Sequence, residues 1–375
     1  MDKVRVLFCI DSVGADAGPD RQLAEMIRRL DPDRFELHLC CFEDCDRLRD
    51  LAHYCTPLVL PVRSLYRLNA LRQMRRLRRY IHDHRIDLVH TWMVKANIFG
   101  VLAARKSDCQ AIISSRRNMG YWLTPFYLAV YRCINRCVTR FLANSQRVKR
   151  YVIDTEHVPA DRIDVLYNGV DMTTYAPGQG DPAAAAALGI PDGAEVVGIV
   201  ANLRPVKNHA LFLRAARLVH DQLPDAAFLL VGTGPLRDDL ATLAEQLGIA
   251  HNVFFSDGRG AVPDYLARMD VGCLSSQSEG FSNAILEYMA AGLPIVATDA
   301  GGNAEAVEHG VTGYIVPHGD PHALAGPIID LLRDDTKRAE MGRRSLERCR
   351  DRFEIGVAIR RFEDYYARLA GQEAE

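Results

Sequence analysis

Short apolar runs alternate with helix-like segments along this chain, and this alternation limits its fold more than any other feature. The runs are three to seven residues long and rich in Val, Ile, Leu and Phe. They cover residues 4–10, 35–40, 86–90, 111–114, 141–143 and 163–166 in the first half, and 196–201, 227–231, 253–255, 271–274 and 294–297 in the second. Continuous apolar runs separated by helices are typical of parallel strands buried on both faces. The sequence therefore predicts an α/β fold built from βαβ units.

A change in composition divides the chain into two parts. Residues 176–193 read APGQGDPAAAAALGIPDG, which favours a linker with one short helix. We expect two doubly wound domains, residues 1–175 and 176–352, with a cleft between them. Because ligands of open α/β sheets bind beyond the carboxyl ends of the strands, the loops at those ends are expected to face the cleft. Residues 353–370 have helical spacing and are predicted to pack back onto the first domain.

Composition argues against several classes of protein. The ten cysteines form no C-x-x-C pair and have no histidine pair nearby to complete a zinc site, so we expect reduced, buried thiols. The segment V-R-V-L-F-C-I near the N-terminus predicts a strand rather than an export signal. No run of about 18 apolar residues is present, which argues against a membrane span. We therefore expect a cytoplasmic protein.

The net charge of −2 hides an asymmetry. Up to Asp171 the chain has 28 basic and 20 acidic residues, whereas the remainder has 18 and 28. The first half is therefore basic and the second acidic. A division of this kind suggests that one half faces an anionic surface.

The segment from Arg63 to Arg79 concentrates the basic charge. It holds seven arginines, together with apolar residues spaced three apart, which are Leu65, Leu68, Leu71, Met74 and Leu77. One side of such a helix is apolar and the others are cationic, as in a helix that lies on a membrane surface. A helix packed on the core with its arginines in water has the same pattern. Charge favours the hypothesis that the helix lies on an anionic membrane surface, and both interpretations stay open.

The segment S-E-G-F-S-N-A-I-L-E at residues 278–287 carries the strongest site signal. It follows a predicted strand and opens a helix, for which Ser282 is the expected N-cap. The first amides of that helix, those of Asn283, Ala284 and Ile285, would then point towards a ligand. A helix start of this kind is a ready site for an anion.

Two carboxylates flank this predicted helix start. Glu279 precedes the helix and Glu287 lies about a turn and a half into it. One can accept hydrogen bonds from a sugar and the other from a ribose, with a diphosphate held between them. Gly280 would let the backbone approach the ligand closely. The alternative is a capped helix with two solvated glutamates.

A second signal is A-N-L-R-P-V-K-N at residues 201–208, directly after a predicted strand. Arg204 and Lys207 lie three apart at a strand-to-helix junction. Two cations beside a helix start suit a diphosphate, on which negative charge grows as it leaves. In a site without a metal ion they would supply the charge that Mg²⁺ supplies elsewhere. The alternative is a solvated loop with two surface cations.

Two glycine-rich turns follow further predicted strands. V-G-T-G-P at residues 231–235 can seat a nucleotide base or ribose against the backbone, or can be a tight turn only. D-A-G-G-N-A-E at residues 299–305 precedes a helix. Its alternative is a glycine turn whose glutamate is favoured by the helix dipole without any ligand. All four motifs stand at the carboxyl ends of strands in one half. Four unrelated structural features would not be expected to align in this way.

Together these motifs resemble the family 4 retaining glycosyltransferases, whose fold is the GT-B architecture of two Rossmann-like domains. Glu279 and Glu287 match the family's E-x7-E motif. The supporting segments are A-N-L-R-P-V-K-N, V-G-T-G-P, N-G-V-D at residues 168–171, N-S at residues 144–145 and A-A-G-L-P-I-V-A-T-D-A-G-G-N-A-E at residues 290–305. The resemblance spans nearly the whole chain.

The resemblance implies roles for individual residues. Arg204 and Lys207 would bind the donor diphosphate, and Glu279 would contact the transferred sugar. Glu287 would hold the ribose. Further donor contacts are expected from Gly280, Phe281, Ser282 and Asn283 at the helix start, from Gly232, Gly234, Gly258 and Arg259 near the base, and from Gly14 or Gly18 in the first loop.

The sequence departs from the family pattern at two places. Many relatives have G-R-L-x-x-x-K, whereas here Asn202 takes the arginine position, and we expect Arg204 to substitute. Many relatives also carry a histidine in the loop after the fifth strand of the first domain. Here that loop reads S-S-R-R-N-M-G, so that Arg116 and Arg117 become candidates for acceptor recognition. His90, in V-H-T-W at a strand end, is a further candidate for the acceptor side, with a structural role as the alternative.

The resemblance implies a transfer that retains the anomeric configuration and needs neither a metal ion nor a cofactor. The expected donor is a nucleotide sugar, with UDP favoured over GDP. The expected acceptor is a glycan or lipid-linked saccharide of bacterial surface polysaccharide synthesis, reached peripherally at the inner face of the plasma membrane. Nucleic acid is not expected as a partner. The alternatives are a GT-B nucleotide-sugar epimerase or phosphorylase and a non-enzymatic nucleotide-sugar binder, but the E-x7-E motif beside R-P-V-K favours transfer.

Overall fold

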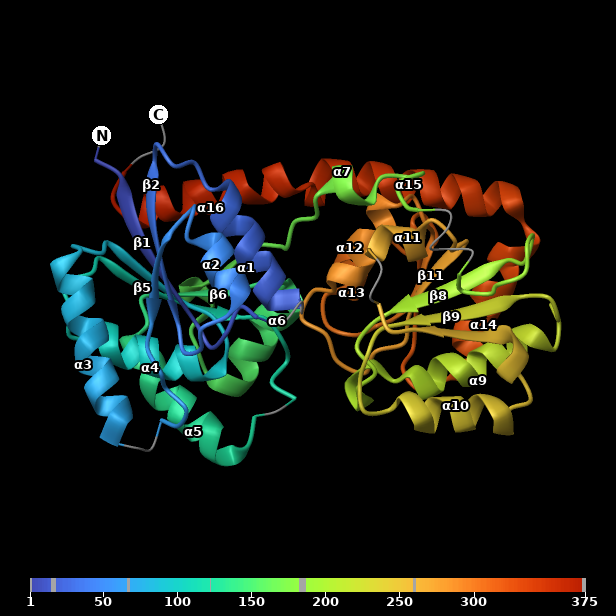
Figure 1. Cartoon of the computed structure of the whole chain (residues 1–375), viewed down its shortest axis with the longest axis horizontal. Helices are drawn as coiled ribbons and strands as arrows, with labels where there is room; N and C mark the ends of the chain where they lie inside the picture. Colours follow the sequence, from blue (N-terminus) through green and yellow to red (C-terminus); the bar gives the residue numbers. More distant parts are fainter. Residues whose placement is uncertain are drawn as a thin grey trace. The chain divides into compact units, whose positions relative to one another are not determined.

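The computed structural model describes residues 2–14, 18–65, 68–121, 123–181, 187–258 and 261–372. The chain forms two compact units, one made of Met1–Asn168 with Gly356–Glu375 and the other of Gly169–Ile355. Each unit contains one parallel sheet with helices packed on its two faces (Figure 1). The predicted α/β class with two Rossmann-like domains is therefore confirmed.

The first unit is built on a seven-stranded sheet in the order β3-β2-β1-β4-β5-β6-β7. All neighbouring strands run parallel, and Val4 is in register with Phe35 on the next strand. The strands are β1 (Val4–Ile10), β2 (Phe35–Cys41), β3 (Thr56–Val59), β4 (Leu88–Thr91), β5 (Ala111–Arg116), β6 (Arg140–Ala143) and β7 (Ile163–Val165).

Alternate side chains of β1 point to opposite faces of this sheet, and both sets are largely apolar. Helices therefore cover both faces. Leu7 and Cys9 belong to the core that packs against α3 and α4, whereas Phe8 faces Tyr366 of α16. The helices of the unit are α1 (Gly18–Arg29), α2 (Asp46–Leu51), α3 (Leu68–Asp83), α4 (Val94–Ala104), α5 (Pro125–Ile134), α6 (Gln146–Tyr151) and α16 (Ile355–Leu369). Helix α6 continues into a π-helix over Val152–Glu156, and 3-10 turns cover Asn135–Cys137 and Ala160–Arg162.

The second unit is built on a six-stranded parallel sheet in the order β10-β9-β8-β11-β12-β13. The strands are β8 (Val196–Val200), β9 (Ala227–Val231), β10 (Val253–Ser256), β11 (Val271–Leu274), β12 (Ile295–Thr298) and β13 (Gly313–Val316). The helices are α7 (Met172–Tyr175), α9 (His209–His220), α10 (Arg237–Gln246), α11 (Val262–Leu266), α12 (Asn283–Ala290), α13 (Asn303–Ala306), α14 (Pro321–Arg333) and α15 (Asp335–Phe353), with 3-10 turns at Pro205–Lys207 and Ala250–Asn252. In Figure 1, α9, α10 and α14 lie on one face of this sheet and α11, α12 and α13 on the other.

The boundary between the units lies after Asn168, whereas the sequence predicted it after residue 175. The physical reason is a backbone pairing at residue 170. The amide of Val170 donates to the carbonyl of Phe353 at 2.9 Å, and the amide of Ile355 donates to the carbonyl of Val170 at 2.9 Å. Helix α7 then packs on α11 and α12 of the second unit. The short helix predicted in the linker falls largely on residues 182–186, outside the described residues.

Two strands were missed by the sequence analysis, and both lie at sheet edges. Strand β3 reads T-P-L-V and is half exposed, so it has no continuous buried apolar run. Strand β13 reads G-Y-I-V and has buried residues only at its two ends. Edge strands bury less surface than central ones, which weakens the apolar signal on which the prediction relied. The cysteines also differ from expectation, since Cys133 is exposed and three others are half-buried.

Buried His90 should make the first unit sensitive to acid. Burial, followed by the charge of Arg117, lowers the pKa of His90 well below its ordinary value of 6.5. The unfolded state takes up the proton near pH 6.5 and the folded state does not, so stability falls as the pH drops below that value. We expect this histidine to remove about 2 kcal/mol of stability between pH 6.5 and pH 5.

The measurement is the free energy of unfolding in urea at pH 7 and pH 5, with tryptophan fluorescence as the signal. Both tryptophans, Trp92 and Trp122, belong to the first unit, so the signal reports on that unit. His90→Asn should be less stable at pH 7 but should lose less between the two pH values than the natural protein. The exposed His53→Asn variant is the control and should keep the natural dependence. An unchanged pH dependence in His90→Asn would contradict the prediction.

Candidate functional site

The four motif loops of the second unit pack on one another through their backbones. They follow β8, β9, β11 and β12, whose carboxyl ends share one edge of the sheet. The amide of Leu203 donates to the carbonyl of Thr233 at 2.9 Å, and the amide of Gly302 donates to the carbonyl of Gly280 at 2.8 Å. The loops after β8 and β9 are therefore joined, as are the loops after β11 and β12.

Glycine is required at two of these contacts. Gly232 has φ of +144° and Gly301 has φ of +54°, backbone conformations that L side chains rarely adopt. A Cβ atom on Gly232 would overlap the carbonyl oxygen of Ala201, and one on Gly301 would overlap the carbonyl oxygen of Glu279. The glycines of these motifs thus bring the loops close enough to place their side chains together.

Lys207 and Glu279 meet at the centre of this arrangement. The ammonium Nζ of Lys207 donates to Oε1 of Glu279 at 2.5 Å, and the hydroxyl of Ser276 donates to the same oxygen at 2.6 Å. The side chain of Glu279 is 10% exposed and that of Lys207 is 25% exposed. Two residues 72 positions apart in the sequence are therefore paired in a largely buried setting.

The backbone around Lys207 is fixed from the neighbouring strand. The hydroxyl of Ser275 donates to the carbonyl of Lys207 at 3.1 Å, and the amide of Gln277 donates to the carbonyl of Val206 at 2.8 Å. His209 is buried beside this turn. Burial, followed by the charge of Lys207, lowers the pKa of His209 to about 4. That histidine is therefore neutral at pH 7, so Lys207 supplies the positive charge here.

Arg204 occupies a different environment from Lys207. It begins the 3-10 turn at Pro205–Lys207, and its side chain is exposed. No described residue forms an ion pair or a side-chain hydrogen bond with it. The structure therefore brings Lys207 to Glu279 and leaves Arg204 at the surface of the same turn.

The helix predicted after Glu279 begins as expected, but its cap differs. Helix α12 starts at Asn283 with Ser282 at the N-cap position, and the Ser282 side chain makes no capping hydrogen bond. Ser282 is therefore the N-cap residue that the sequence predicted, but it caps the helix without a hydrogen bond from its hydroxyl. Glu287 is 3% exposed within this helix, and Phe281 is 4% exposed with its ring 5.4 Å from that of Phe353. The solvated-glutamate alternative therefore fails for both carboxylates.

The remaining predicted donor contacts are loop glycines. Gly234 packs against the backbone of Leu203, and Gly258 lies next to Gly232. Both glycines therefore lie where the loops of the second unit pack on one another. Arg259 lies outside the described residues. Gly14 lies in the loop after β1 and Gly18 is the first residue of α1, both in the first unit.

His90 has a structural role and does not line a surface that could contact an acceptor. It is 0% exposed, with Nδ1 2.7 Å from the hydroxyl of Tyr366 and Nε2 2.7 Å from the hydroxyl of Ser115. Both ring nitrogens are thus used inside the protein. The sequence placed His90 at a strand end but could not show which way its side chain points.

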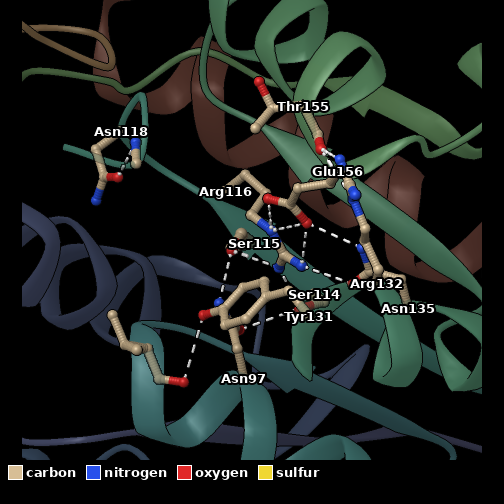
Figure 2. Close-up of polar contacts among 12 residues, drawn as sticks. Asn97, Ser114, Ser115, Arg116, Asn118, Tyr131, Arg132, Asn135, Thr155 and Glu156 are labelled. Atoms are coloured by element: carbon tan, nitrogen blue, oxygen red, sulfur yellow. Dashed lines mark hydrogen bonds and ion pairs between the residues drawn. The ribbon is translucent and has the colours of Figure 1, made fainter. Parts of the chain in front are cut away.

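Arg116 is also internal, and it is fully paired (Figure 2). Its Nε and Nη2 donate to the two carboxylate oxygens of Glu156 at 2.9 Å each. Nη2 also donates to Asn135 at 2.9 Å and Nη1 to the hydroxyl of Ser114 at 2.7 Å, while the guanidinium lies 4.6 Å from the ring centre of Tyr131. Arg116 therefore has no donor left for an acceptor. The sequence missed its partner Glu156, which lies 40 positions away and carries no motif.

Arg117, its neighbour, stands beside a pocket. The guanidinium lies 4.3 Å from the ring centre of Trp92, and Nη2 donates to the side-chain oxygen of Asn168 at 2.5 Å. A pocket of about 210 Å³ opens where β5 ends and α4 begins, lined by Arg116, Arg117, Met93 and Tyr121 among others. Of the three residues predicted for the acceptor side, Arg117 is thus the one with an unpaired side-chain nitrogen among the described residues, although its guanidinium contacts Trp92 and Asn168, which do not line the pocket.

Among the residues that the structure describes, no group of three or more His, Cys, Asp or Glu side chains is arranged to hold a metal ion. No described helix is both long enough and apolar enough to cross a membrane.

Comparison with known proteins gives two family matches and several relatives. The model described as "Glycosyl transferases group 1" matches residues 181–348, and that described as "Glycosyltransferase Family 4" matches residues 17–174. The chain is 24% identical over 363 residues to the UDP-Gal:alpha-D-GlcNAc-diphosphoundecaprenol alpha-1,3-galactosyltransferase of Escherichia coli, with 93% of each chain covered. It is 30% identical over 286 residues to the GDP-mannose-dependent alpha-(1-6)-phosphatidylinositol monomannoside mannosyltransferase of Mycolicibacterium smegmatis, which covers 71% of this chain and 72% of that protein.

Solved structures support the fold. The complex of Anabaena Alr3699/HepE with UDP and glucose superposes with a TM-score of 0.84 at 24% identity, covering 97% of this chain and 100% of that chain. A likeness at this identity bears on architecture, and it agrees with two Rossmann-like units.

The glycine contact under Glu279 can be tested with a matched pair of substitutions. Gly301→Ala and Gly310→Ala both force alanine into a left-handed backbone conformation, which costs roughly 1 kcal/mol. Only Gly301→Ala adds an overlap with the backbone of Glu279, since nothing lies within 4 Å of a Cβ on Gly310. We expect a clearly larger drop in the thermal midpoint for Gly301→Ala, measured by circular dichroism. Equal drops would contradict the backbone packing of these loops.

Proposed function

The chain belongs to the family 4 glycosyltransferases, and from this premise we propose a metal-independent transfer that retains the anomeric configuration of the sugar. Family membership makes the protein a transferase that acts on nucleotide sugars. The observation that carries the proposal is the contact between Lys207 and Glu279, which joins a cation and a carboxylate at the carboxyl edge of the second sheet. A cation suits the leaving diphosphate, and a carboxylate suits sugar hydroxyls.

The proposed reaction breaks the bond between the anomeric carbon and the diphosphate. Lys207, with Arg204 as the second cation, offsets the negative charge that grows on the leaving oxygen. The acceptor hydroxyl attacks from the same face of the sugar, and its proton passes to the departing phosphate oxygen. Glu279 accepts hydrogen bonds from the sugar, so that its anomeric carbon is held in position. No enzyme carboxylate is needed as a nucleophile, in contrast to retaining glycosidases.

The other donor contacts remain as the sequence predicted them. We assign Glu287 to the ribose and the start of α12, from Gly280 to Asn283, to the donor sugar and phosphates. We assign Gly232, Gly234, Gly258 and Arg259 to the base, and Gly14 or Gly18 to the donor phosphate. UDP is favoured as the nucleotide because the Escherichia coli relative is named for UDP-Gal and the Anabaena structure holds UDP, although the mycobacterial relative is named for GDP-mannose.

The acceptor is proposed to be a lipid-linked saccharide of bacterial surface polysaccharide synthesis. The Escherichia coli relative, which matches over 93% of both chains, is named for a diphosphoundecaprenol acceptor. Such an acceptor would require the enzyme to work at a membrane surface.

Helix α3 has features suited to an anionic membrane surface. It packs on α4 through Leu77 and Ile81, yet Leu68 and Leu71 are 85% and 53% exposed. Its five arginines are Arg72, Arg75, Arg76, Arg78 and Arg79, and none forms an ion pair with any residue that the structure describes. One side of the helix packs on the core, and its N-terminal turn leaves apolar residues exposed, which supports the membrane-surface interpretation without excluding the other. We propose that this turn and the arginines contact anionic lipid.

Lys207→Ala should lower the rate of UDP release from a UDP-sugar by about 10²- to 10³-fold, because it removes the charge that stabilises the leaving group. The assay is a panel of UDP-sugars with a lipid extract as the acceptor source. Lys337→Ala, another half-exposed lysine of the second unit, is the matched control and should keep natural turnover. Natural turnover in Lys207→Ala would refute the proposed role, and loss of turnover on adding EDTA would refute metal independence.

Arg72→Gln combined with Arg75→Gln should weaken binding to anionic vesicles. Each basic residue near an anionic surface contributes about 1 kcal/mol, so the pair should lower partitioning roughly 30-fold. Co-flotation with phosphatidylglycerol vesicles at low salt measures the effect. The control, Arg350→Gln with Arg360→Gln, removes the same charge from exposed positions of α15 and α16. Equal losses in both variants, or no flotation of the natural protein, would refute the surface.

A further inference from the structure

Lys207 and Glu279 hold one another in the second unit, although the proposed reaction needs each of them for the donor. The ammonium Nζ of Lys207 donates to Oε1 of Glu279 at 2.5 Å. The two side chains are 25% and 10% exposed, and partly buried charges are screened less than exposed ones. The contact with Glu279 therefore offsets much of the positive charge that Lys207 has to offer a phosphate.

A chain of hydrogen bonds fixes the Glu279 carboxylate in this position. The hydroxyl of Ser276 donates to the same Oε1 at 2.6 Å, and the hydroxyl of Thr298 donates to the carbonyl of Ser276 at 2.6 Å. The side-chain amide of Asn303 donates in turn to the carbonyl of Thr298 at 3.1 Å. Ser276, Thr298 and Asn303 are all buried. The carboxylate is thus anchored from β12 and α13 and stays within reach of Lys207.

Lys207 is the one cation that pairs with Glu279 among the described residues. His209, buried beside the same turn, is neutral at pH 7 because burial, followed by the charge of Lys207, lowers its pKa to about 4. Arg204 is exposed and forms no ion pair with any described residue. A negative ligand that draws on Lys207 therefore leaves a buried carboxylate with less compensation, which costs free energy.

A sugar attached to the diphosphate relieves this conflict. The described hydrogen bonds to the Glu279 side chain both reach Oε1, so Oε2 has capacity for further donors. Sugar hydroxyls are neutral donors, and a hydrogen bond to a carboxylate stabilises it without adding charge. The ammonium of Lys207 can then direct its donors to the diphosphate. A nucleotide diphosphate that has lost its sugar brings the negative charge without these hydroxyls.

We propose that Glu279 competes with the diphosphate for Lys207, so that the site favours the intact donor over the nucleotide diphosphate product. This inference rests on the proposed function, because it assigns the selectivity of the same donor site. Before transfer, the sugar hydroxyls occupy Glu279 and Lys207 serves the leaving group. After transfer the sugar has left with the acceptor, Glu279 returns to Lys207, and the product is held more weakly.

The test measures the affinity of the full chain for UDP and for the UDP-sugar that it turns over fastest in the panel above, by calorimetry without acceptor. Glu279→Gln keeps the shape of the side chain but removes its charge. This variant should bind UDP roughly ten- to hundredfold more tightly than the natural protein, the size of one charged hydrogen bond. Its preference for the UDP-sugar over UDP should fall by at least that factor. Glu245→Gln, an exposed glutamate of α10, is the matched control and should change neither affinity.

A double-mutant cycle identifies Lys207 as the origin of the effect. In a Lys207→Ala background, the gain in UDP affinity from Glu279→Gln should be smaller by roughly tenfold, a coupling typical of side chains in direct contact. Lys207→Ala alone should weaken the UDP-sugar more than UDP, because Glu279 already offsets Lys207 when the sugar is missing. That comparison tests the proposal without any change at Glu279.

Three results would overturn the proposal. They are a Glu279→Gln variant that binds UDP no more tightly than the natural protein, an equal gain in the Lys207→Ala background, and equal losses of UDP and UDP-sugar in Lys207→Ala. The second would show that the carboxylate repels the phosphate directly. A natural protein that binds neither UDP nor any UDP-sugar would instead refute the proposed function. Unchanged circular dichroism spectra show that each variant is folded.

Discussion

In a parallel sheet that is buried on both faces, functional polar side chains can gather only at the ends of the strands. Both units of this protein are built on such a sheet. The strands are apolar along their length because helices cover each side. Polar side chains can therefore gather only in the loops beyond the strand ends, where neighbouring carboxyl ends meet. Lys207 and Glu279 meet at such an edge in the second unit, and Arg117 lies at the corresponding edge of the first.

Adjacent positions in one loop can have unrelated roles. Arg116 and Arg117 look equivalent in the sequence, yet one is a wholly satisfied internal ion pair and the other keeps an uncompensated charge beside a pocket. The difference comes from a single carboxylate that a π-helix brings within reach. The electrostatic character of this loop therefore depends on which of its arginines is neutralised, and not only on how many arginines it contains.

The sequence predicted most strands because their apolar runs are continuous, and it missed two of the four edge strands, β3 and β13, because neither has a continuous buried apolar run. It predicted the meeting of Lys207 and Glu279 because both follow strands that end at one edge. It could not predict that Glu156 pairs with Arg116, since no local pattern links residues 40 positions apart. Nor could it show that His90 points into the core, because side-chain direction at a strand end depends on where the next helix packs.

Helix α16 gives the first unit an unusual dependence on the order of synthesis. Tyr366 completes the hydrogen bonding of His90, and Glu363 accepts from the amide of Asp31 at 2.9 Å, so residues near position 365 finish a core begun at position 4. The whole second unit lies between them in the sequence. On the ribosome, where domains generally fold in the order of their emergence, the second unit is translated in full before the first can close. The nascent first unit must therefore wait with the part of its core that α16 covers left open to solvent.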